Sequence, residues 1–318
     1  MKKLLPLLLI LFLAMTGSPA GAATDYPARS VEIVVPFGAG GDTDFNARVL
    51  AKYLEKELGK AFIITNMAGG GGTIGAEEVQ RSKADGYKLL VMHVQIFTNK
   101  AFGTVDWGYE AMDIVSAYGQ GTGEIVMVRK DFPANNLKEM MAYLKKNPGK
   151  NFGCTPSGGS HYTGVVLNDN GAGLNIVTIG DTGERLVGLK NGTLDVIQSA
   201  LPPARDYIQK GEFKIIGVTL SKRYPSYPDV PTLKEQGIDV SLDPTYTLYA
   251  PKGTPRDVLD KLDAAIKNIV LNNKEYAAEI DKAYKQVPFY MSGKDVKPLF
   301  EEFDKKFMSY SKLLREAY

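Results

Sequence analysis

The spacing of hydrophobic positions alternates between strand-like and helix-like periods along most of the chain. Val31–Val35 is an apolar, β-branched run that predicts a strand, and a loop of mostly small residues follows at 37–43. Apolar residues then recur at helical spacing, which predicts an amphipathic helix: Phe45, Val49, Leu50, Tyr53, Leu54 and Leu58. We expect Asp42 or Thr43 to cap this helix, because side-chain oxygens accept hydrogen bonds from its first N–H groups.

The same alternation continues through the rest of the chain. Asn136 is expected to cap the helix that follows it, and helices dominate after Pro255. Further β-rich runs predict strands at 62–65, 87–93, 151–155, 175–179, 194–198 and 213–220. This order favours an α/β fold in which mostly parallel sheets are covered by helices.

Two more β-rich runs are interpreted as crossings between two lobes. They are Glu124–Arg129, which follows a glycine-rich turn, and residues 245–250. The chain has 318 residues, which exceeds a typical single domain. The predicted division places lobe 1 at residues 24–126 plus 246–318 and lobe 2 at residues 127–245.

The N-terminus predicts a secretory signal. Lys2 and Lys3 give a positive start, and residues 4–15 form a nearly unbroken apolar run that is too short to span a bilayer. Small residues follow, with Gly21 and Ala23 as the pair before the expected cleavage site after Ala23. No cysteine lies near the expected cleavage site, so we do not expect a lipid anchor there. An uncleaved membrane anchor is the alternative.

Charge and cysteine content narrow the class of protein. The chain has 38 basic and 36 acidic residues, and removal of Lys2 and Lys3 leaves 36 of each. A neutral chain without a long charge run is a poor nucleic-acid binder, so we expect no nucleic-acid partner. The single cysteine, Cys154, is expected to be a small packed residue, and stability must come from the core.

Three loops share the order strand, glycine-rich turn, helix: residues 38–44, 69–76 and 157–163, with 180–184 as a possible fourth. Glycine allows close approach of the backbone to a ligand. The first turn of a helix adds free N–H groups and partial positive charge, which suits an anion. The alternative for any single loop is an economical connection between strand and helix. Three such loops in one chain favour ligand contact.

Other chemistry has little support in the sequence. Residues 70–75 match the glycines of a dinucleotide-binding fingerprint only weakly, and no Lys-Ser/Thr pair completes a phosphate loop. His93 and His161 do not have metal-ligand spacing. Ser157 or Ser160 beside His161 leaves a secreted serine hydrolase as an alternative, although sequence neighbours seldom have triad geometry. We therefore expect no metal, no cofactor and no enzymatic activity.

Seven segments together resemble the tripartite tricarboxylate transporter solute receptors, also called Bug or TctC receptors. The first loop at 34–44 and the second at 66–76 resemble the glycine-loop signatures of that family. The others are residues 85–90, 157–161, 189–195, 228–232 and 250–255, in order along nearly the whole mature chain.

The resemblance implies a periplasmic, two-lobed binding protein of type II, a venus-flytrap fold that closes on a ligand in its cleft. Such receptors bind a small carboxylate and deliver it to membrane permease subunits, and we expect a monomer. Hinge motion is expected near Val126 and Thr247. A ligand sensor that presents its closed form to a signalling partner is the alternative role.

Ligand contacts follow from the resemblance by position. Those of the first lobe are Phe37, Ala39, Gly40, Thr43 and Asp44, then Gly72, Thr73 and Ile74; those of the second are Ser157, Gly159, Ser160 and His161. Residues 179–185 depart from the common family pattern and carry two charges. Arg185 would pair with a ligand carboxylate, and Asp181 would attract an amine or hydroxyl group. Either side chain could instead be a solvated loop charge.

Overall fold

The computed structural model describes residues 25–179, 182–225 and 228–317. The predicted signal at 1–23 and the predicted ligand contact Asp181 lie outside these ranges. Within them, none of the helices combines the length and apolar character needed to cross a membrane.

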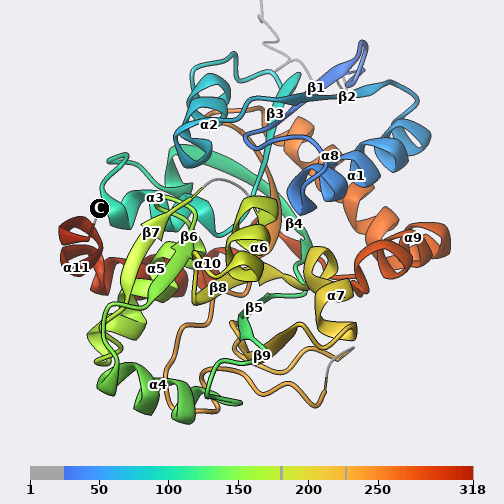
Figure 1. The fold of residues 1–318 in the computed structure, drawn as a ribbon. Coiled ribbons are helices and arrows are strands. Elements are labelled where there is room, and N and C mark those ends of the chain that lie inside the picture. The colour runs from blue at the N-terminus through green and yellow to red at the C-terminus, as the bar shows by residue number, and fades with distance from the viewer. Residues whose placement is uncertain (1–24, 180–181, 226–227, 318) are drawn as a thin grey trace, which may run out of the picture.

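The chain forms two sheets, as Figure 1 shows. The first has the strand order β11-β4-β10-β3-β1-β2. Its strands are β1 (Val31–Val35), β2 (Phe62–Asn66), β3 (Lys88–Met92), β4 (Met112–Gln120), β10 (Thr245–Pro251) and β11 (Met291–Ser292). The second has the order β7-β6-β8-β5-β9. Its strands are β5 (Glu124–Arg129), β6 (Asn151–Cys154), β7 (Asn175–Thr178), β8 (Val196–Ala200) and β9 (Phe213–Val218).

Both sheets are mixed, so the prediction of mostly parallel sheets was wrong. β1 pairs in parallel with β2 and β3, and β6 pairs in parallel with β7 and β8. The antiparallel pairs involve β11, which pairs with β4, and the strands that connect the two sheets. β5 lies antiparallel between β8 and β9, and β10 lies antiparallel between β3 and β4. A strand that arrives from the other sheet enters at the opposite end, and local alternation cannot reveal this.

The chain changes sheet close to, but not at, the predicted first crossing. β4 ends at Gln120 in the first sheet, and all of β5 from Glu124 pairs in the second. Residues 121–123 therefore carry the change, a few positions before Val126. The return places β10 from Thr245 in the first sheet.

Helices cover both faces of each sheet. α1 (Asp42–Leu58) packs with α8 (Arg256–Asn272) over the first sheet. α6 (Thr182–Asn191) and α7 (Leu201–Gln209) cover one face of the second. The remaining helices are α2 (Thr73–Gln80), α3 (Gln95–Phe102), α4 (Leu137–Lys146), α5 (Gly159–Asp169), α9 (Lys274–Tyr284), α10 (Lys297–Ser309) and α11 (Ser311–Glu316), with short 3-10 turns η1 (Gly70–Gly72) and η2 (Tyr109–Ala111).

The two predicted helix caps had different outcomes. Asn136 caps α4 as predicted, since its side chain accepts a hydrogen bond from the backbone N–H of Glu139 at 2.9 Å. The cap of α1 was predicted wrongly. Gly41 is its N-cap and Asp42 is already the first helical residue, although Asp42 Oδ1 accepts the first-turn N–H of Thr43 at 2.9 Å. The Asp42 side chain also faces a cavity.

Candidate functional site

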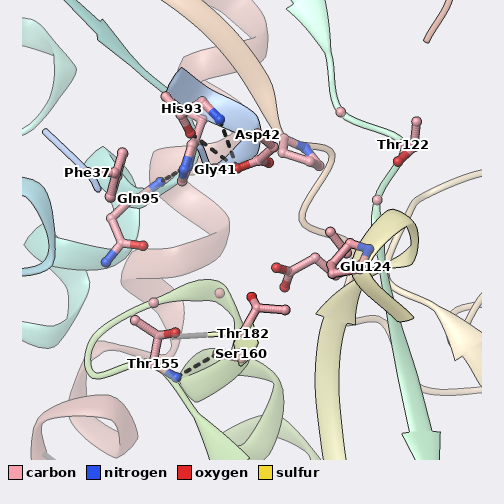
Figure 2. Close-up of a pocket in the computed structure, with 18 of the residues that line it drawn as sticks. Phe37, Gly41, Asp42, His93, Gln95, Thr122, Glu124, Thr155, Ser160 and Thr182 are labelled. Carbon is pink, nitrogen blue, oxygen red and sulfur yellow. Dashed lines mark hydrogen bonds between the residues drawn. The ribbon is translucent and has the colours of Figure 1, made fainter. Parts of the chain in front are cut away.

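A cavity of about 840 Å³ lies where loops of the two sheets meet. The first sheet contributes the turn before α1, the residues after β3, and Tyr246 on β10. The second contributes Glu124 on β5, the first turns of α5 and α6, and Pro202 and Pro203 at the start of α7. Figure 2 shows side chains from both sheets pointing into this one space. A ligand here would contact both halves of the molecule.

Hydrogen bonds to the Asp44 side chain hold the turn before α1 in shape. Gly40 has φ +85°, a left-handed conformation that favours glycine, and its N–H donates to Asp44 Oδ2 at 2.9 Å. Asp44 also accepts bonds from Arg48 Nε and Asn66 Nδ2. Burial alone would raise the pKa of Asp44, but these bonds outweigh burial and lower it. Asp44 therefore supports the turn and does not line the cavity, whereas Phe37, Ala39, Gly40 and Thr43 do.

An aromatic wall closes the first-sheet side. The rings of Phe37 and His93 are stacked, with centroids 4.9 Å apart, and Tyr246 meets His93 edge-on. His93 Nδ1 accepts a bond from the backbone N–H of Gln95 at 3.2 Å. Burial lowers the pKa of His93, against the opposing effect of Asp42, so the imidazole is neutral at physiological pH.

The second glycine loop does not reach the cavity wall, although its residues were predicted as ligand contacts. The ring of Phe37 lies over Gly72, where an added Cβ would meet it at 3.2 Å. Asn99 on α3 donates to the carbonyl of Gly71 and holds the loop back. The side chain of Ile74 is 58% exposed. Gly72, Thr73 and Ile74 are thus separated from the cavity by packing that forms only in the folded chain.

The loop before α5 contributes its helix start to the wall. Gly159 and Ser160 line the cavity, and Ser160 Oγ accepts the N–H of Thr155 at 2.9 Å. Ser157 and His161 are buried behind this surface. His161 packs on the ring of Phe102, with centroids 4.6 Å apart, and its Nδ1 accepts the backbone N–H of Ser157. That bond runs from the backbone, so the imidazole is not placed as a base for the Ser157 hydroxyl.

Arg185 lies at the bottom of the cavity with 3% of its surface exposed. Its guanidinium donates to Thr155 Oγ1 at 2.6 Å, to Thr182 Oγ1 at 3.0 Å and to the carbonyl of Gln198 at 3.3 Å. A hydroxyl oxygen that accepts from a cation directs its own proton elsewhere. Thr155 and Thr182 both line the cavity, and each hydroxyl retains its proton for a partner other than Arg185.

The sequence did not single out two carboxylates that line the cavity. Asp42 Oδ2 accepts the Tyr246 hydroxyl at 2.7 Å, across more than 200 residues of chain. Glu124 Oε2 accepts the amide Nε2 of the buried Gln198. Burial raises the pKa of Glu124, against opposing effects of Arg185 and Gln198. Glu124 is the first residue of β5 and follows the glycine-rich turn. From the sequence, this strand was interpreted only as a crossing between lobes.

Other residues also line the cavity. Gly38, Gly41, Gly158, Thr182 and Gly183 lie in loops that were predicted to contact a ligand, and the rest come from separate strand ends and loops that the sequence did not single out. The latter are His93, Val94, Gln95, Gly121, Thr122, Gly123, Thr155, Ala200, Pro202, Pro203, Thr219, Leu242, Pro244, Tyr246, Tyr284 and Gln286. The strand-to-loop positions of His93 and Thr155 were the one local signal available.

The described residues offer neither a metal site nor a reactive thiol. Among the described residues, no group of His, Cys, Asp and Glu side chains could hold a metal ion. Cys154 is fully buried in the core, and burial raises the pKa of its thiol to about 12. A buried thiol with that pKa stays protonated, so Cys154 packs in the core and does not act as a nucleophile.

Comparison with known proteins identifies the family. A UPF0065 protein of Bordetella pertussis is 34% identical over 262 residues, covering 80% of each chain. The periplasmic binding protein BugD has 28% identity and a TM-score of 0.76, covering 92% of this chain and 98% of that one. MatC from Rhodopseudomonas palustris with bound malate has 25% identity and a TM-score of 0.75, covering 90% and 100%. The family model for the tripartite tricarboxylate transporter family receptor matches residues 46–310, and the chain belongs to that family of periplasmic solute receptors.

Proposed function

We propose that this protein is an exported receptor that captures a small carboxylate in the cavity between its two sheets and delivers it to membrane permease subunits. The observation that carries the proposal is the convergence of the N-terminal turns of α1, α5, α6 and α7 on one cavity. The protein would act in the periplasm, as a monomer, after removal of residues 1–23.

The physical basis is anion binding by dipoles. At α5 and α6 the first N–H groups lack intrahelical partners and add partial positive charge beside the cavity. α7 contributes less, because Pro202 and Pro203 have no N–H, and the N–H of Thr43 on α1 is bonded to Asp42. The hydroxyls of Ser160, Thr155 and Thr182 add donors, and the buried charge of Arg185 polarises two of them. These groups can replace the water around a carboxylate without a cluster of basic side chains. Among the predicted ligand contacts, this favours Phe37, Ala39, Gly40, Thr43, Gly159, Ser160 and Arg185.

The relatives are consistent with this ligand class. MatC, which has the same fold at 25% identity, holds malate. We propose that the present protein uses its equivalent cavity for a carboxylate as well.

Closure of two lobes would follow from where the cavity lies. We propose that the two predicted lobes, at residues 24–126 plus 246–318 and at 127–245, close on the ligand, with their boundaries moved to residues 121–123 and to just before Thr245, where the chain changes sheet. The change of sheet at residues 121–123 supports a first crossing just before β5. Ligand contacts from both sides would stabilise the closed form.

The direct test is a thermal-shift screen of purified residues 24–318. The library would contain mono-, di- and tricarboxylates, aromatic acids and amino acids, with neutral sugars as controls. A ligand at 100 times its dissociation constant adds about 2.7 kcal/mol of stability. That raises Tm by several degrees in a protein of this size. Shifts given only by sugars or other compounds without a carboxylate would contradict the proposal.

A further inference from the structure

The charges on the cavity wall are unusual for a site that takes only anions. Of the described lining residues, Asp42 and Glu124 are acidic, Arg185 is basic, and His93 is neutral. The remaining described lining residues carry no formal charge. Carboxylates therefore outnumber the cation within the described wall.

The two kinds of charge are also separated. The guanidinium of Arg185 is directed to Thr155, Thr182 and the backbone of Gln198. The Glu124 carboxylate accepts instead from Gln198 Nε2, although the charge of Arg185 still acts on Glu124 and opposes the effect of burial on its pKa. Figure 2 shows the Glu124 side chain reaching into the space between Asp42 and the pair Thr155 and Thr182. One side of the cavity is rich in donors and the other offers carboxylate oxygens.

Both carboxylates are held in place rather than free to turn away. Gln198, which is fully buried, donates to Glu124, and Tyr246 donates to Asp42 at 2.7 Å. The N–H of Thr43 also donates to Asp42, at 2.9 Å. Withdrawing two fixed carboxylates from water when the cleft closes is unfavourable unless the ligand supplies donors or positive charge. A ligand made only of carboxylates would instead add like charge beside them.

We infer that the ligand carries a cationic amine as well as a carboxylate, with Glu124 and Asp42 accepting the amine while the α5–α6 side holds the carboxylate. Glu124 would then be the residue that selects amine-bearing from amine-free acids. The inference rests on the proposed function, because it assigns a chemical class to the ligand of the same cavity.

The competing arrangement is a protonated Glu124 that donates a hydrogen bond to a ligand carboxylate. Burial, which raises the pKa of Glu124, makes this a real alternative, and the groups that face Glu124 include Asp42, Arg185 and Gln198. The two arrangements give opposite pH dependence. An ammonium ligand binds more tightly as Glu124 loses its proton, whereas a carboxylate that needs a donor binds more weakly.

The experiment is calorimetric titration of full-length mature protein with matched pairs of acids. The pairs are aspartate and succinate, 4-aminobutyrate and butyrate, and 4-(aminomethyl)benzoate and 4-methylbenzoate. We expect the amine-bearing member of at least one pair to bind at least tenfold more tightly than its partner. Between pH 5 and pH 8 its affinity should rise.

Glu124→Gln keeps the shape and the contact with Gln198 but removes the charge. It should reduce the preference for the amine at least tenfold and abolish the rise in affinity with pH. Asp42→Asn, which can still accept from Tyr246, should reduce the preference less and serves as the second variant if Glu124→Gln unfolds. Asp106→Asn is the control, since Asp106 is exposed and lies outside the cavity.

Tight binding of amine-free acids in every pair would overturn the inference while leaving the proposed function intact. An amine preference that survives both Glu124→Gln and Asp42→Asn would also overturn it. The proposed function fails separately if propylamine or putrescine binds and no carboxylate does. A titration series in which no acid binds overturns both.

Discussion

At the scale of single residues, the cavity wall places hydroxyls next to a buried charge. Thr155 accepts a short bond of 2.6 Å from Arg185 while also lining the cavity. Its proton is therefore available to a ligand, and the adjacent cation makes it a stronger donor. A charge acting through such a hydroxyl can attract an anion without direct contact.

Replacing Thr155 with valine should weaken carboxylate binding by about tenfold, which corresponds to the loss of one hydrogen bond of roughly 1.4 kcal/mol. Valine matches the shape of threonine but removes the hydroxyl. Thr155→Ser, which keeps the hydroxyl, should bind nearly as well as the wild type. Calorimetry with the best carboxylate from the screen would measure both. Equal affinity of the valine variant would show that this hydroxyl does not contact the ligand.

Gly40 and Gly38 provide a matched test of backbone conformation in the first loop. An added Cβ would meet no atom within 4 Å at either position, but only Gly40 has a left-handed φ, at +85°. Gly40→Ala should lower the free energy of unfolding by about 1 kcal/mol, because alanine is strained in that region. Gly38→Ala should change it by only a few tenths of a kcal/mol. Chemical denaturation of both variants would measure the difference, and equal stabilities would exclude strain as the cause.

At the scale of elements, α10 is tied to the loop before β10 by charge. Lys306 on α10 donates to Asp239 at 2.9 Å and to the carbonyl of Ser241 at 2.8 Å. Asp239 also accepts bonds from the backbone and hydroxyl of Ser241. Burial alone would raise the pKa of Asp239, but the bonds from Ser241 and Lys306 hold it well below its usual range.

Asp239→Asn should therefore destabilise the protein near neutral pH and not at strongly acid pH. A carboxyl whose pKa is lowered on folding contributes stability above its unfolded pKa of about 4, and that contribution disappears as pH falls towards the folded value. The effect should be at most about 1 kcal/mol, since the side chain is 44% exposed. Melting curves at pH 7 and pH 2.5 would measure it. A difference in Tm that is as large at pH 2.5 as at pH 7 would point to packing instead of charge.

At the scale of the whole molecule, one hydrophobic cluster spans both sheets, while two further clusters each pack against a single sheet. A single cluster of buried residues includes Leu90 of the first sheet, Phe152 of the second, and Phe307 on α10. Tyr162 on α5 meets Phe307 and Tyr310 edge-on, with ring centroids 4.9 and 5.5 Å apart. The cavity thus opens on one side of a molecule whose halves are joined by continuous packing.

This shared core predicts one cooperative unfolding transition rather than one for each half. Tyr162→Ala should lower the stability of the whole protein by about 3–5 kcal/mol, by analogy with other truncations of large buried rings. Tyr162→Phe should be close to neutral, because the hydroxyl has no hydrogen-bond partner among the described residues. Differential scanning calorimetry would show whether the protein unfolds in one transition or in two. Two separate transitions, with only one moved by Tyr162→Ala, would show that the halves unfold independently.

Much of this organisation could be predicted from local sequence. β1 and β5 have the predicted limits, Asn136 caps α4, and the predicted glycine turns at 38–44 and 157–163 end at the cavity. Such features depend on interactions between residues that are close in sequence, so a short segment is enough to predict them. The order of motifs along the chain was enough to identify the family and the fold class.

Contacts between segments that are distant in the sequence could not be predicted from local sequence. The Asp42 carboxylate was interpreted as a helix cap, and only the arrival of Tyr246 on β10 shows it bonded within the cavity wall. Phe37 and Asn99 keep the second glycine loop from the wall, although its sequence is as rich in glycine as the first. Sequence by itself determined which loops join a strand to a helix through a glycine-rich turn. Tertiary structure decided which of them do line the cavity and which charges face it, because burial and pairing depend on residues that the fold brings together.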